Sequence, residues 1–183
     1  SNRLTVAAAR TPEVQPGVVA GPGGRRTAVP WATFLTSRAR TTGVDVDRVS
    51  QALRPEGANA GTQRWRELAF LHWEVDAAAL RQQIPAGLTL DTFEGRAFVG
   101  VVPFAMEGVR PRWSPISFDF LETNVRTYVH KDGRDPAVFF FSLDAASWLA
   151  VQAARVGWGL PYHHATMSLT RTDQRVAYET VRR

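Results

Sequence analysis

The chain has 183 residues, of which 44% are hydrophobic and 10% aromatic, and this apolar content is enough for one packed domain with a tail. It contains no cysteine, which excludes disulfides, thiolate metal ligands and a cysteine nucleophile. No apolar run approaches the roughly 20 residues of a membrane helix, and the first residues lack the apolar stretch of a signal peptide. We therefore expect a cytoplasmic protein without a membrane partner.

The formal net charge of +5 invites comparison with nucleic-acid-binding proteins, in which clustered basic groups neutralise phosphates. The arginines of this chain are instead interleaved with acidic residues along its whole length. The only doublets are Arg25-Arg26 and Arg182-Arg183, and no nucleic-acid-binding motif is present. Arginine almost wholly replaces lysine, so the basicity is in part a compositional bias. We expect no nucleic-acid partner.

Residues 1–62 differ in amino-acid composition and patterning from the rest of the chain. The segment 14–30 is rich in glycine and proline, which favour irregular backbone. The segments 31–40 and 45–54 carry apolar residues at helical spacing, which predicts short helices that dock on the body of the protein or on a neighbouring subunit. We interpret residues 1–62 as an amino-terminal arm.

From residue 63 onward the sequence alternates between turn signals and runs of β-branched and aromatic residues, as in a sheet protein. A strand over 68–75 precedes a short helix over 76–84, for which Asp76 is the predicted N-cap. The segments 88–93 and 96–102 flank Glu94-Gly95 and predict a hairpin.

Two longer strands, 118–130 and 137–145, flank a polar loop and predict a second hairpin. The segment 146–156 predicts the one main helix, with Asp144 as N-cap and Gly157 or Gly159 as C-cap. Strands over 165–171 and 175–183 follow. The last strand would leave an open edge, which the arm, a partner subunit or further residues should cover, and we expect a homo-oligomer.

Four segments carry a resemblance to a known family: 70–111 (FLHWEVDAAALRQQIPAGLTLDTFEGRAFVGVVPFAMEGVRP), 120–129 (FLETNVRTYV), 139–151 (FFFSLDAASWLAV) and 159–165 (GLPYHHA). In this order and spacing they resemble the YqjF-like family of uncharacterised bacterial proteins, within the acetoacetate decarboxylase-like superfamily. The resemblance implies an antiparallel β-barrel with one main helix, wrapped by additional strands around a ligand cavity, over residues 63–183. It does not cover the arm. It also implies that a carboxy-terminal segment of the family is missing here.

In the decarboxylase, a Gly-x-Pro-Lys-Lys turn supplies the lysine that forms a Schiff base with the substrate, activated by its neighbouring cation. The matching turn here begins at Gly159 and places Tyr162 and His163 where the two lysines would stand. The only lysine in the sequence is Lys131, in a polar turn where a solvated ammonium stays protonated. The resemblance therefore implies a related site without imine chemistry.

Strand alternation over 121–129 places Glu122, Asn124, Arg126 and Tyr128 on one face. This face either meets solvent or lines the cavity, and the resemblance implies that Glu122 reaches the cavity. Glu122 and Arg126 lie about 13 Å apart along a strand, too far for a direct ion pair. We predict a catalytic role for Glu122 and a ligand-binding role for Asn124 and Arg126.

Tyr162 and His163 follow a glycine and a proline, and their titratable groups suit acid and base roles. The structural alternative is a tyrosine packed at the rim and a histidine bonded to nearby carbonyls. His72 is either a hydrogen-bonded structural residue or a ligand-binding one. These histidines, with His164 and Glu122, carry the donor types of a zinc site, but His163 and His164 are adjacent and point in opposite directions on a strand. We predict neither a metal nor a cofactor.

The sequence thus leads to two functional hypotheses. The first is an enzyme that acts on a small carboxylate- or carbonyl-bearing metabolite without a Schiff-base lysine, with Glu122, Tyr162 and His163 in acid–base roles. The alternative is a non-catalytic module that binds or senses a small molecule. Convergence of polar groups in the cavity favours the enzyme, whereas an apolar pocket with one anion-binding group favours the binder.

Overall fold

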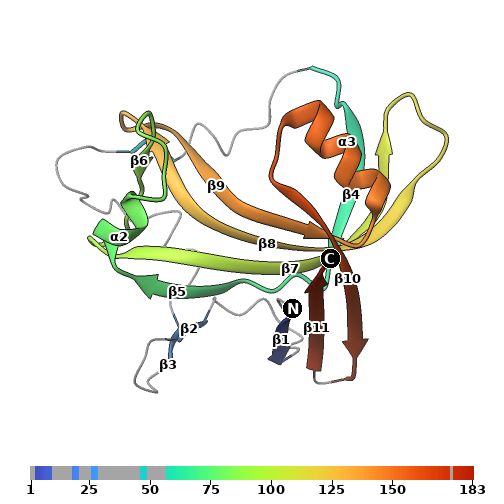
Figure 1. Cartoon of the computed structure of the whole chain (residues 1–183), viewed down its shortest axis with the longest axis horizontal. Helices are drawn as coiled ribbons and strands as arrows, with labels where there is room; N and C mark the ends of the chain where they lie inside the picture. The colour runs from blue at the N-terminus through green and yellow to red at the C-terminus, as the bar shows by residue number, and fades with distance from the viewer. Residues whose placement is uncertain (1–2, 10–17, 21–25, 29–45, 49–56, 174) are drawn as a thin grey trace.

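The computed structural model describes residues 3–9, 18–20, 26–28, 46–48, 57–173 and 175–183 (Figure 1). In chain order, the elements are β1 (Arg3–Ala9), β2 (Val18–Ala20), β3 (Arg26–Ala28), β4 (Gly61–Arg66), β5 (Leu71–Val75), α2 (Ala77–Arg81), β6 (Thr89–Leu90), β7 (Ala97–Pro111), β8 (Phe118–Lys131), β9 (Arg134–Ala145), α3 (Trp148–Trp158), β10 (Tyr162–Arg171) and β11 (Arg175–Arg182). The protein is mainly β. Within the described residues, no helix is long and apolar enough to cross a membrane.

The strands form one mixed sheet with the order β1-β11-β10-β9-β8-β7-β5-β2-β3, while β4 pairs with β7 and β6 with β8. β10 runs parallel to β9, and β2 runs parallel to β5, whereas the sequence predicted antiparallel pairing. The first parallel contact arises because α3 carries the chain back between β9 and β10, as a crossover connection requires. Among the described strands the sheet path does not close, so a complete barrel stays a prediction.

The sheet is strongly curled at its β1 end. Figure 1 shows β10, β11 and β1 turning away from the long strands β7, β8 and β9. Although β1 and β7 are far apart in the strand order, Val6 packs with Val101, Val176 and Tyr178 in one buried cluster. Burial of these apolar side chains stabilises the curl and gives β8 a covered inner face.

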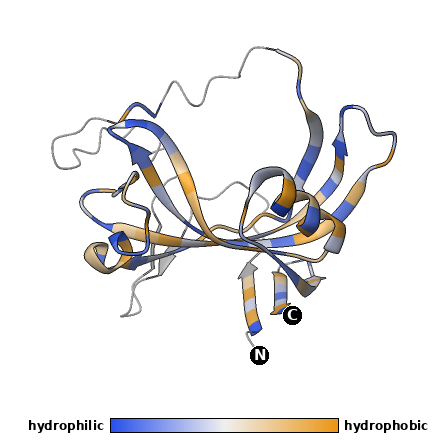
Figure 2. Cartoon of the chain, turned by 45° about the horizontal axis from the view of Figure 1, so that its top comes forward, coloured by the Kyte–Doolittle hydropathy of each residue, from blue (hydrophilic) through white to orange (hydrophobic). Residues whose placement is uncertain are grey.

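Both faces of β8 are covered near its middle. Thr123, Thr127 and Val129 are buried on one face, and Glu122 and Asn124 are buried on the other. Figure 2 shows the corresponding alternation of hydrophilic and hydrophobic residues along the long strands. The polar face of this strand is therefore buried near Glu122 rather than solvated.

The helix caps differ in part from the prediction. Asp76 caps α2 as expected, accepting a hydrogen bond of 2.7 Å from the amide of Ala79. α3 is capped by Ser147, not Asp144, because β9 continues through Asp144 to Ala145 before the helix begins. Gly159 ends α3 in the left-handed region at φ 63, which favours glycine.

The predicted hairpin between the segments 88–93 and 96–102 forms only at its turn. β6 pairs with β8, where Leu90 lies opposite Val129, although a bridge between Phe93 and Arg96 closes the expected turn. Leu90 is buried in a cluster with Leu80 and Val129, so apolar packing decides the strand's partner. The second predicted hairpin, β8 with β9, is confirmed.

The described parts of the arm contact the body at several places. β1 pairs with β11 along its whole length and covers the edge that the sequence left open. Arg48 donates hydrogen bonds of 2.5 and 2.7 Å to the two carboxylate oxygens of Asp91. The helix predicted over 31–40 lies outside the described residues. Residues 46–48 are not helical, and the remainder of the segment 45–54, where a short helix is predicted, lies outside the described residues.

Candidate functional site

A row of polar side chains lies along one face of β8, beside mainly apolar residues of the neighbouring strand β7. In register, Glu122 lies opposite Phe104, Asn124 opposite Val102, and Arg126 opposite Gly100. Tyr162 enters this row from β10, because its strand partner on β9, Leu143, is itself the partner of Asn124. These four residues of the row therefore come from β8 and β10, with β9 between the two strands.

Glu122 is the buried acid of the row, with an exposed fraction of 3%. The Tyr162 hydroxyl donates a hydrogen bond of 3.0 Å to its Oε2. Burial raises the pKa of Glu122 to about 7, while hydrogen bonding by Tyr162 and Asn124 acts in the opposite direction. Burial and the charge of Glu122 also raise the pKa of Tyr162, so its hydroxyl stays protonated.

Asn124 and Arg126 each carry a buried polar atom without a hydrogen-bond partner among the described residues, namely Asn124 Oδ1 and Arg126 Nε. Asn124 is 3% exposed. The Arg126 guanidinium lies 5.2 Å from the ring centre of Phe70 and 5.9 Å from that of Tyr128. Because unpartnered buried polar atoms are costly, these two are candidates for contact with a ligand.

His72 lies at the other end of the row. Its Nε2 is 2.5 Å from the Tyr128 hydroxyl. Burial, and secondarily the charge of Arg126, lowers the pKa of His72 to about 4, so the ring is neutral at pH 7. A Cβ at Gly100 would lie only 3.1 Å from His72 Nε2, so glycine at this position allows the ring to approach β7 closely.

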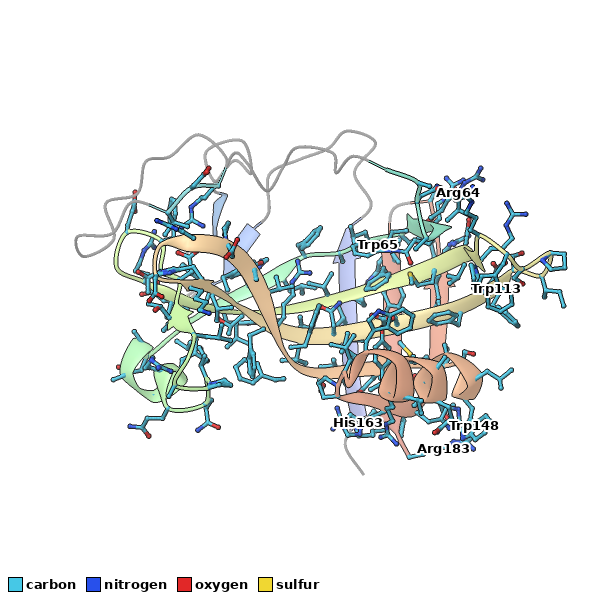
Figure 3. The ribbon with its side chains drawn as sticks, turned by 90° about the horizontal axis from the view of Figure 1, so that it is seen from above. Arg64, Trp65, Trp113, Trp148, His163 and Arg183 are labelled. Atoms are coloured by element: carbon cyan, nitrogen blue, oxygen red, sulfur yellow. The ribbon has the colours of Figure 1, made fainter. Side chains whose placement is uncertain are left out.

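The structure does not bring His163 into this row. His163 pairs with Asp144 on β9, and alternation turns its side chain away from that of Tyr162. Burial and the charges of Arg182 and Arg155 lower the pKa of His163. The charged groups near His163 are therefore these arginines and Asp144, not Glu122 or Arg126. Figure 3 shows His163 beside α3 and away from Trp65. The expectation that it shares a site with Glu122 is therefore wrong.

The family model for the uncharacterized conserved proteins of DUF2071 matches residues 62–183. The chain belongs to this family. The uncharacterized protein YqjF of Bacillus subtilis (strain 168) is 38% identical over 132 residues, which is 70% of this chain and 54% of YqjF. The chain thus spans about half the length of this relative. The resemblance inferred from the motifs is confirmed.

Similar solved structures have acetoacetate decarboxylase-like folds. Acetoacetate decarboxylase from Legionella pneumophila is 20% identical with a TM-score of 0.49, over 66% of this chain and 46% of that one. The enduracididine biosynthesis enzyme MppR, complexed with pyruvate, is 17% identical with a TM-score of 0.45, over 57% of this chain and 40% of that one.

Of the predicted site residues, the row contains Glu122, Asn124, Arg126, Tyr162 and His72. The part of the chain that the structure describes has no group of three or more His, Cys, Asp or Glu placed to hold a metal. Sequence reasoning did not assign Tyr128 or Phe70 to the site. Strand alternation already placed Tyr128 on the face of Glu122, whereas Phe70 precedes β5 and no pattern indicated its contact with Arg126.

Proposed function

We propose that this chain acts on a small carboxylate- or carbonyl-bearing metabolite by acid–base chemistry at the row of Glu122, Asn124, Arg126 and Tyr162. The observation that carries the proposal is a buried carboxyl, Glu122, whose pKa is about 7 and which receives a hydrogen bond from Tyr162. Perturbed titratable groups of this kind cluster at functional sites. We further propose that the curled sheet is part of an acetoacetate decarboxylase-like barrel.

Glu122 suits proton transfer because a pKa near neutrality populates both its acid and its base form at working pH. Tyr162 suits a different role. Its raised pKa keeps the hydroxyl protonated, so it orients the Glu122 carboxyl as a hydrogen-bond donor and does not itself remove a proton.

Arg126 and Asn124 support binding of the metabolite. Arg126 has an N–H donor at Nε and a positive charge, which match a carboxylate or a polarised carbonyl oxygen. Asn124 Oδ1 is an acceptor that matches a ligand hydroxyl or N–H. Asn124 lies between Arg126 and Glu122 on this face of β8, so a metabolite bound to both Asn124 and Arg126 extends toward the proposed acid–base group.

The proposed chemistry does not involve an imine. Lys131, the only lysine in the sequence, is exposed at the turn between β8 and β9. It is nine positions beyond Glu122 on the same strand, about 30 Å at the usual rise. Tyr162 carries a hydroxyl and no amine, so it cannot form an imine in place of a lysine.

A non-catalytic binding module is the second candidate, and a specific feature favours it. The walls beside the row are apolar, with Val102 and Phe104 on β7, and Arg126 is packed over Phe70. A single cation among apolar walls is typical of a site that holds an anion without changing it.

The experiment is a panel of small carboxylates and carbonyl compounds, followed by NMR for both binding and product formation. We expect Glu122→Gln to lower kcat by about 10²- to 10⁴-fold while the substrate still binds. The matched control is Glu107→Gln, the same change at a half-exposed residue that pairs with Arg66. Unchanged turnover in Glu122→Gln would refute the acid–base proposal, and binding without turnover in the unaltered protein would favour the binding module.

A further inference from the structure

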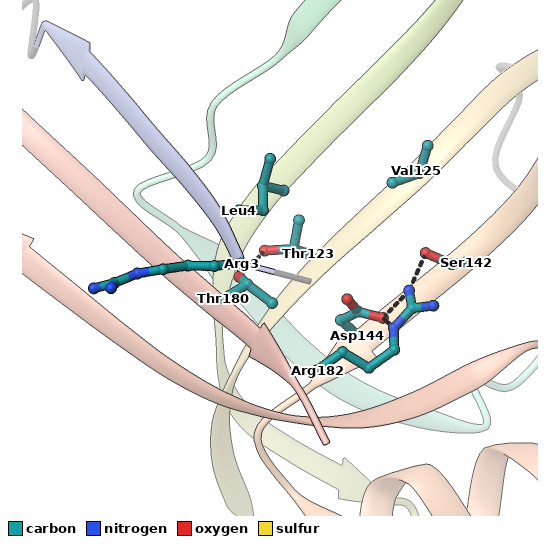
Figure 4. A pocket seen from close by; sticks show the side chains of 8 residues that line it. All are labelled: Arg3, Leu4, Thr123, Val125, Ser142, Asp144, Thr180 and Arg182. Carbon is teal, nitrogen blue, oxygen red and sulfur yellow. Dashed lines mark hydrogen bonds and ion pairs between the residues drawn. The ribbon is translucent and has the colours of Figure 1, made fainter. Parts of the chain in front are cut away.

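A pocket of about 360 Å³ lies on the opposite face of β8 from Glu122. Its walls come from β1, β8, β9 and β11 (Figure 4). Thr123 and Val125 contribute from β8, and strand alternation directs them away from Glu122 and Asn124. The pocket is therefore separate from the candidate site, and its volume is within the range of small-molecule sites.

An ion pair between Arg182 and Asp144 forms one side of the pocket. Arg182 Nη2 donates hydrogen bonds of 2.6 Å to Asp144 Oδ1 and 2.9 Å to Ser142 Oγ, and Arg182 Nε donates one of 3.1 Å to Asp144 Oδ1. Within the described residues, no hydrogen bond uses Arg182 Nη1 or Asp144 Oδ2. The positive charge of Arg182 and the negative charge of Asp144 balance each other. The N–H groups of Arg182 Nη1 and the Asp144 Oδ2 atom still offer donors and an acceptor to a ligand.

Two buried threonines form another side. The hydroxyls of Thr123 and Thr180 are 3.1 Å apart, and only one of the two can donate to the other. The hydrogen of the accepting hydroxyl remains available to a ligand. Leu4 and Val125 add apolar surface beside these polar groups.

We propose that this pocket binds a small neutral polyhydroxy molecule, a polyol or a monosaccharide. Each hydroxyl of such a molecule both donates and accepts, which matches the neighbouring donors and acceptors of Arg182, Asp144 and the threonine pair. A small anion or cation would meet charges that already neutralise each other. Arg3, at the pocket, is likewise paired with Glu179.

The test uses glycerol, xylitol and D-ribose as probes, with acetate and glycine as charged molecules of similar size. Binding is measured by saturation-transfer NMR and calorimetry on the unaltered chain, on Glu122→Gln and on the double variant Thr123→Val/Thr180→Val. The double variant keeps the shape of both side chains and removes both hydroxyls. Leu4→Trp, at a partly exposed position, narrows the pocket without altering a buried polar group.

We expect the polyols to bind, xylitol and D-ribose more tightly than glycerol because they carry more hydroxyls. Both pocket variants should weaken binding about tenfold or more, as expected for the loss of one or two hydrogen bonds or of space. Glu122→Gln should bind as the unaltered chain does. The proposal is overturned if no polyol binds, if acetate or glycine binds more tightly, or if Leu4→Trp and the double variant bind normally.

Discussion

The Tyr162 hydroxyl lies 3.0 Å from Glu122 Oε2, although the two residues are 40 positions apart in the chain. This bond links the first residue of β10 to the middle of β8 and brings a hydroxyl donor to a buried acid. In the unfolded chain neither group has this partner. The titration of Glu122 is therefore a property of the fold and can be tested as one.

Replacing Tyr162 by phenylalanine should raise the pKa of Glu122 above its present value of about 7. The hydrogen bond from Tyr162 stabilises the carboxylate, whereas the phenylalanine ring preserves burial and offers no donor. Carboxyl titration followed by ¹³C NMR measures the change. Tyr178→Phe is the control, because the Tyr178 hydroxyl donates to the Glu67 carbonyl and not to Glu122. A lower or unchanged pKa in Tyr162→Phe would contradict the assigned role.

Stability should depend on pH with opposite signs at the two ends of the row. The folded-state pKa of Glu122 is about 7 and its usual value is 4.5, so its contribution to stability falls as pH rises through this window. The pKa of His72 is about 4 in the fold and ordinarily 6.5, so its contribution falls as pH decreases through that window. Each effect is of the order of 3 kcal/mol, and between pH 4.5 and 6.5 they offset.

Single substitutions separate the two effects. We expect the free energy of unfolding of Glu122→Gln to rise with pH across this range, and that of His72→Gln to fall. Urea unfolding at several pH values measures both slopes. Equal slopes in the two variants would show that the row does not control the pH dependence.

No covalent imine should form with acetoacetate or similar keto acids, because Lys131 is the only lysine in the sequence and is exposed. The measurement is borohydride reduction in the presence of acetoacetate, followed by mass spectrometry of the intact chain and its peptides. We expect no adduct. A substrate-sized mass increase on Lys131 would refute this prediction.

Arg48→Ala should lower the free energy of unfolding by about 2 kcal/mol, because it leaves the buried Asp91 carboxylate without its bidentate partner. The double variant Arg48→Ala/Asp91→Asn should recover part of the loss. Arg96→Ala is the matched control, since Arg96 forms exposed pairs with Glu74 and Glu94 and should cost much less. If Arg48→Ala and Arg96→Ala have equal effects in urea unfolding, the contact does not anchor the arm.

Deleting residues 1–9 should expose the edge of β11 and cause concentration-dependent association, because unpaired strand edges recruit other strands. Light scattering over a range of protein concentrations detects this. The control removes only residues 1–2 and leaves β1 in place. A deletion variant that stays as stable and as dispersed as the control would mean that β1 does not protect the edge.

The sequence by itself determined the local structure and the residue types of the site. Turn signals and alternation located the long strands β8 and β9, and the glycine and proline before Tyr162 marked the turn that leads from the main helix into β10. Alternation also grouped Glu122, Asn124 and Arg126 on one face, because a strand has a period of two. These features depend only on neighbouring residues, so a sequence can specify them.

Only the tertiary structure decided which distant groups meet. Parallel pairing of β10 with β9 brought Tyr162 to Glu122 and turned His163 away, and the strand register set His72 beside Gly100 and Tyr128. The continuation of β9 made Asp144 the partner of Arg182 instead of a helix cap. Register and crossover depend on how apolar surfaces from several strands pack together, and no short stretch of sequence encodes that balance.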